Sequence, residues 1–291
     1  MELDRDQLQI DIHNLYNREH AALGNEHTYR LLDEGKQWDV SETLRSGGVV
    51  VFPHAGVWDC GQQIAAAVHG ALDSGTDKVV VISVLHAFTD AMQDARVRVA
   101  NGENPNQWPF WGIQGPGFSE RDEWTRDHAL ISWRHFWAVE TKRRGIKGPQ
   151  VIERYPYLAG GRPDLLPGID ELAREVEDAV IVSTADPFHH GIGYGDAPED
   201  SYFPHEGGLD LARKTLLEGI AMLEKGDYAG YNQHCVTAKS DARDAGQVFR
   251  YLRGPMKGKI LDLKHSEAGE LYKTPDPTWV ATALFDWKLT A

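Results

Sequence analysis

The chain contains three short runs in which almost every residue is apolar. They are rich in valine and isoleucine and cover residues 49–52, 78–85 and 178–185. Continuous apolar runs of this length are typical of strands that are buried on both faces of a sheet. Segments of helical composition lie at residues 62–72, 121–144 and 166–177. This alternation predicts an α/β fold with a mixed or parallel central sheet that is flanked by helices.

The two ends of the chain follow other patterns. Residues 4–20 place apolar side chains among charged ones at helical spacing, which predicts an N-terminal helical arm over about residues 1–45. Two longer strands are expected at residues 258–267 and 278–289, at a sheet edge or in a small second sheet, after helices at 209–225 and 241–252. Because no linker or internal repeat interrupts the sequence, we expect residues 1–291 to form a single domain.

One loop, residues 103–124, is unusually rich in aromatic side chains. It combines prolines and glycines with Trp108, Phe110, Trp111, Phe118 and Trp124. One interpretation is an irregular surface loop whose aromatic side chains anchor it to the body of the protein. The other is a wall or lid over a pocket that takes a flat or apolar substrate.

Charge and cysteine content exclude several classes of protein. The chain has 30 Lys and Arg residues against 44 Asp and Glu, a formal net charge of −14. Because nucleic-acid affinity depends on cationic side chains, a general nucleic-acid binder is not expected. Two cysteines cannot form a disulfide framework, and neither a signal sequence nor a run of about eighteen apolar residues is visible. We expect a cytoplasmic protein with no membrane partner, and a homodimer only as the commonest default.

Each of the three apolar runs ends next to a residue that can carry chemistry. His54 follows the first run, His86 the second, and Asp186 and His189 the third. The carboxyl ends of strands in an α/β sheet meet where ligands bind, so we expect these side chains to lie close together. A single histidine in such a loop is more often a hydrogen-bonded structural residue, but three at one sheet edge favour a functional site.

A histidine cluster of this kind supports two types of chemistry. Imidazole binds iron, copper, zinc or nickel, and two histidines with one carboxylate or thiolate leave coordination positions open. Alternatively, paired histidines with Asp186 would act as metal-free acid and base catalysts. Cys235 follows His234 in a polar segment and is the candidate thiolate, although most free cysteines pack as small apolar side chains.

Four segments resemble the Memo-like family, which belongs to the wider superfamily of class III extradiol dioxygenases. They are PHAGVWDCGQQIAAA (53–67), VVVISVLH (79–86), VIVSTADPFHHG (180–191) and LDLARKTLLEGIAMLEKGDYAGYNQHC (209–235). A weaker similarity links the segment DHAL (127–130) to a Glu-His-Ser-Leu segment. The chain departs from the family in two places: Ala87 follows His86 where a second histidine is common, and CVTAKS replaces a CGR-like sequence.

The resemblance implies a metal site at the ends of the sheet strands. His54 and His86 would be metal ligands, and Cys235 would take the place of the carboxylate ligand of the ring-cleaving enzymes. His189 would be the acid/base residue with Asp186 beside it, and the weaker similarity adds His128 to the catalytic candidates. Fe(II) is the metal suggested first, with copper or zinc as alternatives.

These observations lead to one main hypothesis and two others. The main hypothesis is a mononuclear non-haem iron oxygenase that uses dioxygen on a small substrate, with aromatic molecules among the candidates. The second is a metal-dependent hydrolase or lyase on the same residues, in which the metal activates water. The third is a non-catalytic Memo-like protein that binds a ligand or copper.

Overall fold

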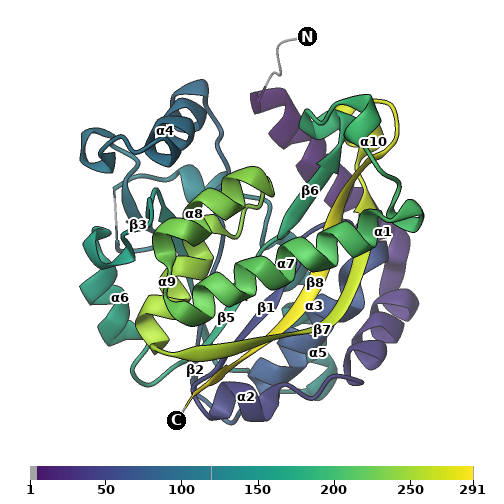
Figure 1. The fold of residues 1–291 in the computed structure, drawn as a ribbon. Coiled ribbons are helices and arrows are strands. Elements are labelled where there is room, and N and C mark those ends of the chain that lie inside the picture. Colours follow the sequence, from purple (N-terminus) through teal and green to yellow (C-terminus); the bar gives the residue numbers. More distant parts are fainter. Residues whose placement is uncertain (1–4, 119, 291) are drawn as a thin grey trace.

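A mixed sheet of eight strands forms the centre of the protein. The structure is a computed structural model that describes residues 5–118 and 120–290 (Figure 1). In this part of the chain the sheet order is β3-β4-β2-β5-β1-β8-β6, and β7 pairs with β8. The strands are β1 (Val49–Phe52), β2 (Lys78–Ile82), β3 (Gly112–Gln114), β4 (Gln150–Tyr157), β5 (Val180–Thr184), β6 (Phe188–Gly191), β7 (Met256–Glu267) and β8 (Thr278–Leu289).

The middle of the sheet is parallel and its margins are antiparallel. Strands β4, β2, β5 and β1 run parallel, whereas β3, β6, β7 and β8 pair antiparallel with their neighbours. The predicted α/β fold with a mixed sheet is therefore confirmed. Strand β7 lies at an edge as expected, but β8 joins the main sheet beside β1, so the two do not form a second sheet. Ten consecutive residues of β8 are buried, as a strand in the sheet interior requires.

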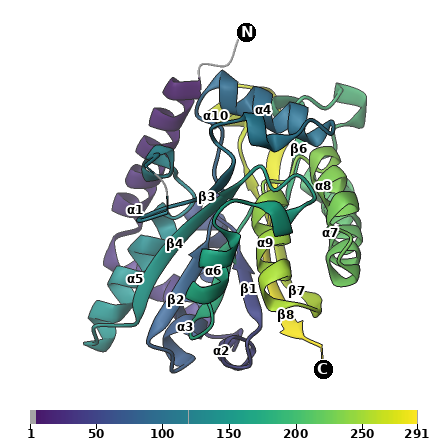
Figure 2. The same ribbon diagram turned by 90° about the vertical axis from the view of Figure 1, so that its left-hand side faces the viewer.

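Helices cover both faces of this sheet (Figure 2). One layer contains α1 (Arg5–Gly35), α3 (Val57–Asp73) and α5 (Ile131–Arg144). The other contains α6 (Ile169–Glu175), α7 (Gly208–Lys225), α8 (Tyr228–Thr237) and α9 (Arg243–Arg253). Three further helices are α2 (Ser41–Arg45), α4 (Asp90–Ala100) and α10 (Gly269–Tyr272). The N-terminal arm is thus a long helix on one face, interrupted at Gly24, where φ is 57°.

The apolar runs form strands because their side chains alternate between the two helical layers. In β1, Val50 and Phe52 join the core cluster under α1, α3 and α5, whereas Val49 and Val51 join the cluster under α6 to α9. Both faces of the strand must therefore be apolar, which removes the polar positions of a half-exposed strand. No described helix has the length and apolar composition that crossing a membrane requires.

The predicted helix over residues 121–144 is wrong in its first half. Residues Glu123–Arg126 form a short 3₁₀ turn, residues 127–130 are not helical, and α5 begins only at Ile131. The cause is Asp127, whose carboxylate accepts the backbone N–H groups of His86 and Ala129. This side chain competes with helical hydrogen bonding and holds the segment as a loop beside the end of β2.

The aromatic loop anchors itself to the body of the protein. Trp108, Trp111 and Trp124 are partly buried against the core under α1, α3 and α5. The loop also contributes β3, which the sequence pattern did not indicate and which pairs with β4. No described residue of this loop lines the cavity of the candidate site, so the lid interpretation is not supported.

Candidate metal centre

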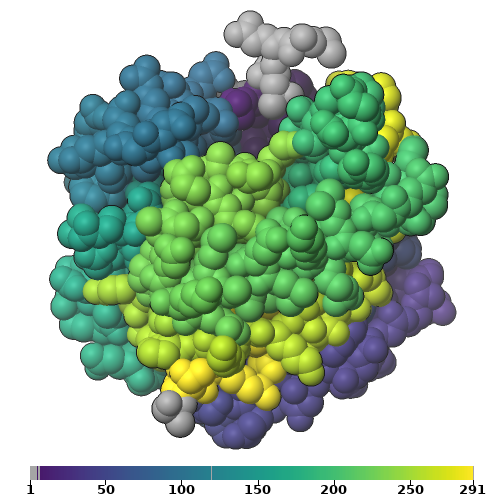
Figure 3. All heavy atoms as spheres, viewed as in Figure 1, coloured from purple at the N-terminus to yellow at the C-terminus, as the bar shows by residue number. Residues whose placement is uncertain are grey.

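The carboxyl ends of β1, β2 and β5 open onto a cavity of about 1010 Å³. His54, His86 and Asp186 follow these strands and line the cavity, together with His189 from β6. The expected convergence of these four residues is therefore seen in the structure. Helix α1, α4 and the segment around α10 form other parts of the wall. Figure 3 shows the surface hollowed between the α4 segment and the segment that follows β6.

The His54 ring is oriented by the hydroxyl of Thr184. Thr184 Oγ1 donates its proton to the carbonyl oxygen of Phe52 at 2.9 Å and lies 3.1 Å from His54 Nδ1. Because a hydroxyl has only one proton, His54 Nδ1 must be the donor in the second contact. In the neutral ring, Nε2 is then the atom with the lone pair; burial would lower the pKa of His54, but the carboxylates of Asp186 and Asp241 raise it. Tyr16 holds the backbone as well, since its hydroxyl donates to the His54 carbonyl at 2.5 Å.

His86 is oriented in the same manner by Asp127. The Asp127 carboxylate lies 3.1 Å from His86 Nδ1 and accepts the His86 backbone N–H at 2.8 Å. Asp127 is 1% exposed, and although burial alone would raise its pKa, the charge of His86 holds that pKa far below its usual range. An ionised carboxylate only accepts, so His86 Nδ1 donates and Nε2 is the atom left for another partner.

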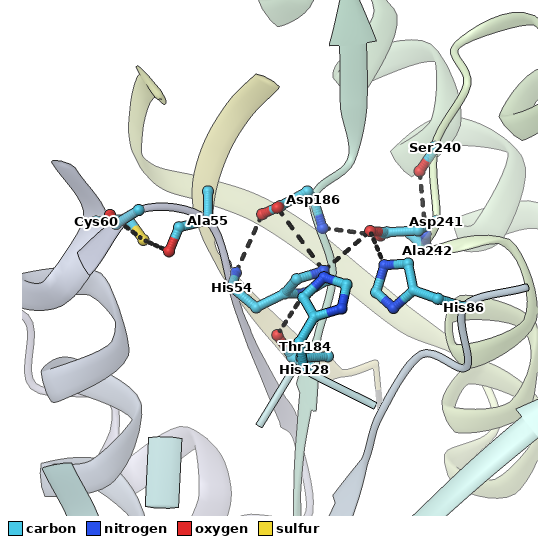
Figure 4. A network of polar contacts seen from close by, with 12 residues as sticks. His54, Ala55, Cys60, His86, His128, Thr184, Asp186, Ser240, Asp241 and Ala242 are labelled. Carbon is cyan, nitrogen blue, oxygen red and sulfur yellow. Dashed lines mark hydrogen bonds and ion pairs between the residues drawn. The ribbon is translucent and has the colours of Figure 1, made fainter. Parts of the chain in front are cut away.

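Asp241 brings a carboxylate oxygen to both of these imidazole nitrogens (Figure 4). Its Oδ1 accepts the backbone N–H of Asp186 at 2.8 Å, which fixes the direction of the group. Its Oδ2 lies 3.1 Å from His54 Nε2 and 3.8 Å from His86 Nε2. Burial would raise the pKa of Asp241, but the neighbouring His54 holds it well below its usual value.

Asp241 Oδ2 is therefore close to one nitrogen of each imidazole. Two imidazole lone pairs and an ionised carboxylate oxygen repel one another unless a cation lies between them. A proton can fill this role, and the carboxylates of Asp127 and Asp241 outweigh burial and raise the pKa of His86 to about 10. A divalent metal ion is the other kind of cation that can fill this role.

One of the two donor separations suits a metal ion. Adjacent ligands of a six-coordinate ion at about 2.1 Å are separated by about 3 Å. The separation of His54 Nε2 and Asp241 Oδ2 is 3.1 Å, and that of His86 Nε2 and Asp241 Oδ2 is somewhat longer at 3.8 Å. Two overlapping sets of donors within 4.8 Å of one another could hold an ion: His54 with His86 and His128, and His54 with Asp186 and Asp241. The combination of His54, His86 and Asp241 draws on both sets and is not itself one of them.

Asp186 acts on His54 rather than on His189. Its Oδ1 accepts the His54 backbone N–H at 3.1 Å, and its Oδ2 lies 3.7 Å from His54 Nε2. Burial raises the pKa of this carboxyl to about 6, although the nearby His54 opposes the effect. Asp186 and His189 line the same cavity, as the sequence predicted, and the hydrogen bonds of Asp186 tie it to His54 and Asp241, with which it forms one of the two donor sets.

His128 and His189 complete the ring of imidazoles around the cavity. His128 stacks on His86 with ring centroids 4.1 Å apart, and its Nδ1 contacts Gln9 Oε1 at 3.0 Å. Burial lowers the pKa of His128 well below its usual value. His189 has a shielded Nδ1 with no hydrogen-bond partner among the described residues, and burial lowers its pKa to about 4. Both side chains are therefore neutral near pH 7 and able to accept a proton.

Cys235 lies in the cavity wall but belongs to neither set of donors. It is a buried residue of α8, 2% exposed, and burial raises the pKa of its thiol to about 12. A thiol of this kind is a poor ligand because thiolate is the form that binds metals. Asp241, six residues later, lies closer to the two imidazoles and offers a carboxylate oxygen to them.

Four arginines that the sequence pattern did not single out also line the cavity: Arg5, Arg18, Arg96 and Arg243. Arg96 comes from α4 and Arg243 is the first residue of α9. Arg243 is 7% exposed, and burial, followed by the like charge of Arg96, lowers its pKa. Asp127 and Asp241 were passed over as well, since neither follows an apolar run.

Comparisons with known proteins supply no family for this chain. No protein-family model matches it, and no curated protein matches its sequence.

Proposed function

We propose that the protein is a mononuclear non-haem iron oxygenase whose Fe(II) is held by His54, His86 and Asp241. The observation that carries this proposal is the approach of His54 Nε2 and His86 Nε2 to the same carboxylate oxygen of Asp241. Two histidines and one carboxylate with open positions are the donor set typical of non-haem Fe(II) oxygenases. The resemblance of four segments to the Memo-like family within the class III extradiol dioxygenases supports the same conclusion.

Bound Fe(II) would supply a redox-active centre with open positions for substrate and dioxygen. The protein's own residues hold and orient the donors. Thr184 and Asp127 fix the two imidazoles with Nε2 inward, and the Asp186 backbone aims Asp241 between them. Such second contacts raise metal affinity because the ligands need no reorganisation on binding.

His189 is the proposed acid/base residue. It lines the same cavity, its Nδ1 has no partner within the described residues, and its pKa near 4 keeps it neutral at physiological pH. A neutral imidazole can take a proton from the hydroxyl of a bound substrate and return it to the product. His128, stacked on His86, is a second candidate for this role.

The proposal is tested by metal analysis and oxygen consumption. Metal-free protein is loaded anaerobically with Fe(II), its iron content is measured, and dioxygen uptake is followed with a panel of catechols. Asp241→Asn is expected to lose iron, whereas Cys235→Ser, in the same cavity wall, is expected to retain it. Iron retained by Asp241→Asn and lost by Cys235→Ser would contradict the assignment, as would full occupancy by zinc after purification under iron-replete conditions.

The three-histidine set favours a second candidate function. His54, His86 and His128 together form a donor group suited to zinc or copper. Zinc there would activate water for a hydrolase or lyase, and copper would suit a non-catalytic binding protein. Activity that is unchanged when oxygen is removed would favour the hydrolase or lyase over the oxygenase.

A further inference from the structure

The cavity wall contains a pair of cations that have no acidic partner. Arg96 in α4 and Arg243 in α9 line the same cavity as the donor set. Within residues 5–118 and 120–290, no carboxylate oxygen lies within 4.0 Å of either guanidinium group. Asp244, next to Arg243 in sequence, is not available, because its two oxygens accept the backbone N–H groups of Leu158 and Ala159.

Three other cations of this cavity differ in this respect, whereas Arg18, an exposed residue of α1 that also lines the cavity, forms no ion pair with any described residue. Arg5 pairs with Asp90, Lys239 with Asp196 and Lys273 with Asp11. Arg243 is 93% buried, and a buried charge is unfavourable unless it is paired. No described residue forms an ion pair with this buried guanidinium group, so it is free to bind an anion that enters the cavity.

We propose that Arg243 and Arg96 form an oxyanion-binding subsite, and that the substrate is a small organic acid whose carboxylate or phosphate group binds there. The planar guanidinium group is suited to this role because it binds such groups through two parallel hydrogen bonds. The inference rests on the proposed function for the identity of the reacting centre. The anion binding itself depends only on the two arginines.

The position of Arg243 in the chain links the subsite to the donor set. Only Ala242 separates it from Asp241, and Asp244 fixes the start of α9 through its contacts with residues 158 and 159. The same short segment thus positions a donor to the proposed metal and a cation for the substrate. An anion held by Arg243 would present the rest of the molecule to the cavity in a defined orientation, which is the main contribution of positioning residues to rate.

The test measures anion binding to the full chain by isothermal titration calorimetry. The probes are benzoate, phenyl phosphate and inorganic phosphate, with benzamide as the neutral counterpart of benzoate. We expect at least one anion to bind about ten- to hundredfold more tightly than benzamide, as the strength of charge-assisted hydrogen bonds indicates. Preference for benzoate or for phenyl phosphate would identify the carboxylate or the phosphate as the group recognised.

Three variants decide whether the arginines are responsible. Arg243→Met and Arg96→Met keep the length of the side chain and remove its charge, so each is expected to abolish the preference. Arg98→Met is the matched control: Arg98 lies on α4, is exposed, pairs with Asp94 and does not line the cavity. Circular dichroism shows whether each variant folds. If Arg243→Met does not fold, Arg96→Met tests the subsite, because Arg96 is partly exposed and its replacement disturbs the core less.

Two results would overturn the inference. One is equal binding of the anions and benzamide to the unmodified protein, or no binding of any anion. The other is an anion preference that survives in folded Arg243→Met and Arg96→Met. Iron content measured on the same samples separates the two proposals, because a preference for anions in protein that cannot hold iron contradicts the oxygenase and leaves the subsite standing.

Discussion

Replacing Asp127 by asparagine tests whether the orientation of His86 controls metal affinity. In the structure Asp127 Oδ2 accepts from the His86 backbone N–H at 2.8 Å and from His86 Nδ1 at 3.1 Å, while Oδ1 accepts from the Ala129 N–H at 2.9 Å. Asparagine has one acceptor oxygen and one donor group, so it cannot satisfy both backbone groups. One backbone N–H loses its acceptor, or the imidazole loses its orienting partner.

The magnitude follows from these contacts. A hydrogen bond to a charged group contributes about 1.5–3 kcal/mol, so we expect Asp127→Asn to lower the free energy of unfolding by about that amount. Loss of an orienting partner of a metal-bound histidine typically costs about ten- to hundredfold in metal affinity, which corresponds to about 1.4–2.8 kcal/mol. Asp127→Asn is therefore expected to lower both the stability of the fold and the affinity for Fe(II), because the same carboxylate holds the loop and orients His86.

The assay is competition for Fe(II) with a chelator of known affinity, combined with urea unfolding of the metal-free protein. Asp122→Asn is the matched control, since Asp122 is an exposed carboxylate on the same segment, five residues earlier. The reasoning is refuted if Asp127→Asn binds Fe(II) within twofold of the control and unfolds at the same urea concentration.

Three further predictions concern other contacts. Thr184→Val, which removes the hydroxyl beside His54, is expected to weaken Fe(II) binding by about tenfold or more, and Thr184→Ser to restore it; equal affinity in all three proteins by the same competition assay would contradict this. Treatment with a chelator should lower the midpoint of thermal unfolding, because a ligand of the folded state stabilises it; an unchanged midpoint in protein shown to contain metal counts against a structural link. Burial and His135 lower the pKa of His20 to about 4, so the unfolded chain binds its proton first and stability falls as pH drops from about 6.5 towards 4. Because His20 is partly exposed, we expect about 1 kcal/mol of this loss by pH 5, measured by urea unfolding at pH 7 and 5, and His20→Gln should remove it; an identical pH dependence in the variant would exclude His20 as the cause.

The core of the sheet could be predicted because its strands are buried on both faces. The apolar side chains of residues 49–52 were enough to predict strand β1. Strands β4 and β6 escaped prediction because their polar residues find partners that are distant in sequence. Arg154 of β4, for example, pairs with Glu175 on α6, and His189 of β6 donates its backbone N–H to Ala238. The pattern of apolar residues does not reveal these distant partners, so it could not predict the two strands.

Some residues of the candidate site could likewise be predicted from the sequence, and others could not. His54 and His86 could be found from the sequence because each follows an apolar strand, and the end of a strand has a known place in an α/β fold. Asp241 could not, because its position depends on the backbone N–H of Asp186, 55 residues earlier. The sequence instead suggested Cys235 as the third metal ligand. Cys235 is buried in α8, where its thiol has the environment of an ordinary core residue.

Helix α1 has a consequence for how such a protein can change during evolution. Its side chains line the cavity, its Tyr16 braces the His54 backbone and its Gln9 contacts His128, yet it lies outside the sheet. The residues proposed to hold the metal come from strand ends and from the loop before α9, whereas much of the cavity outline comes from this separate helix. Substitutions along α1 could therefore redirect which molecules enter while the reaction stays the same.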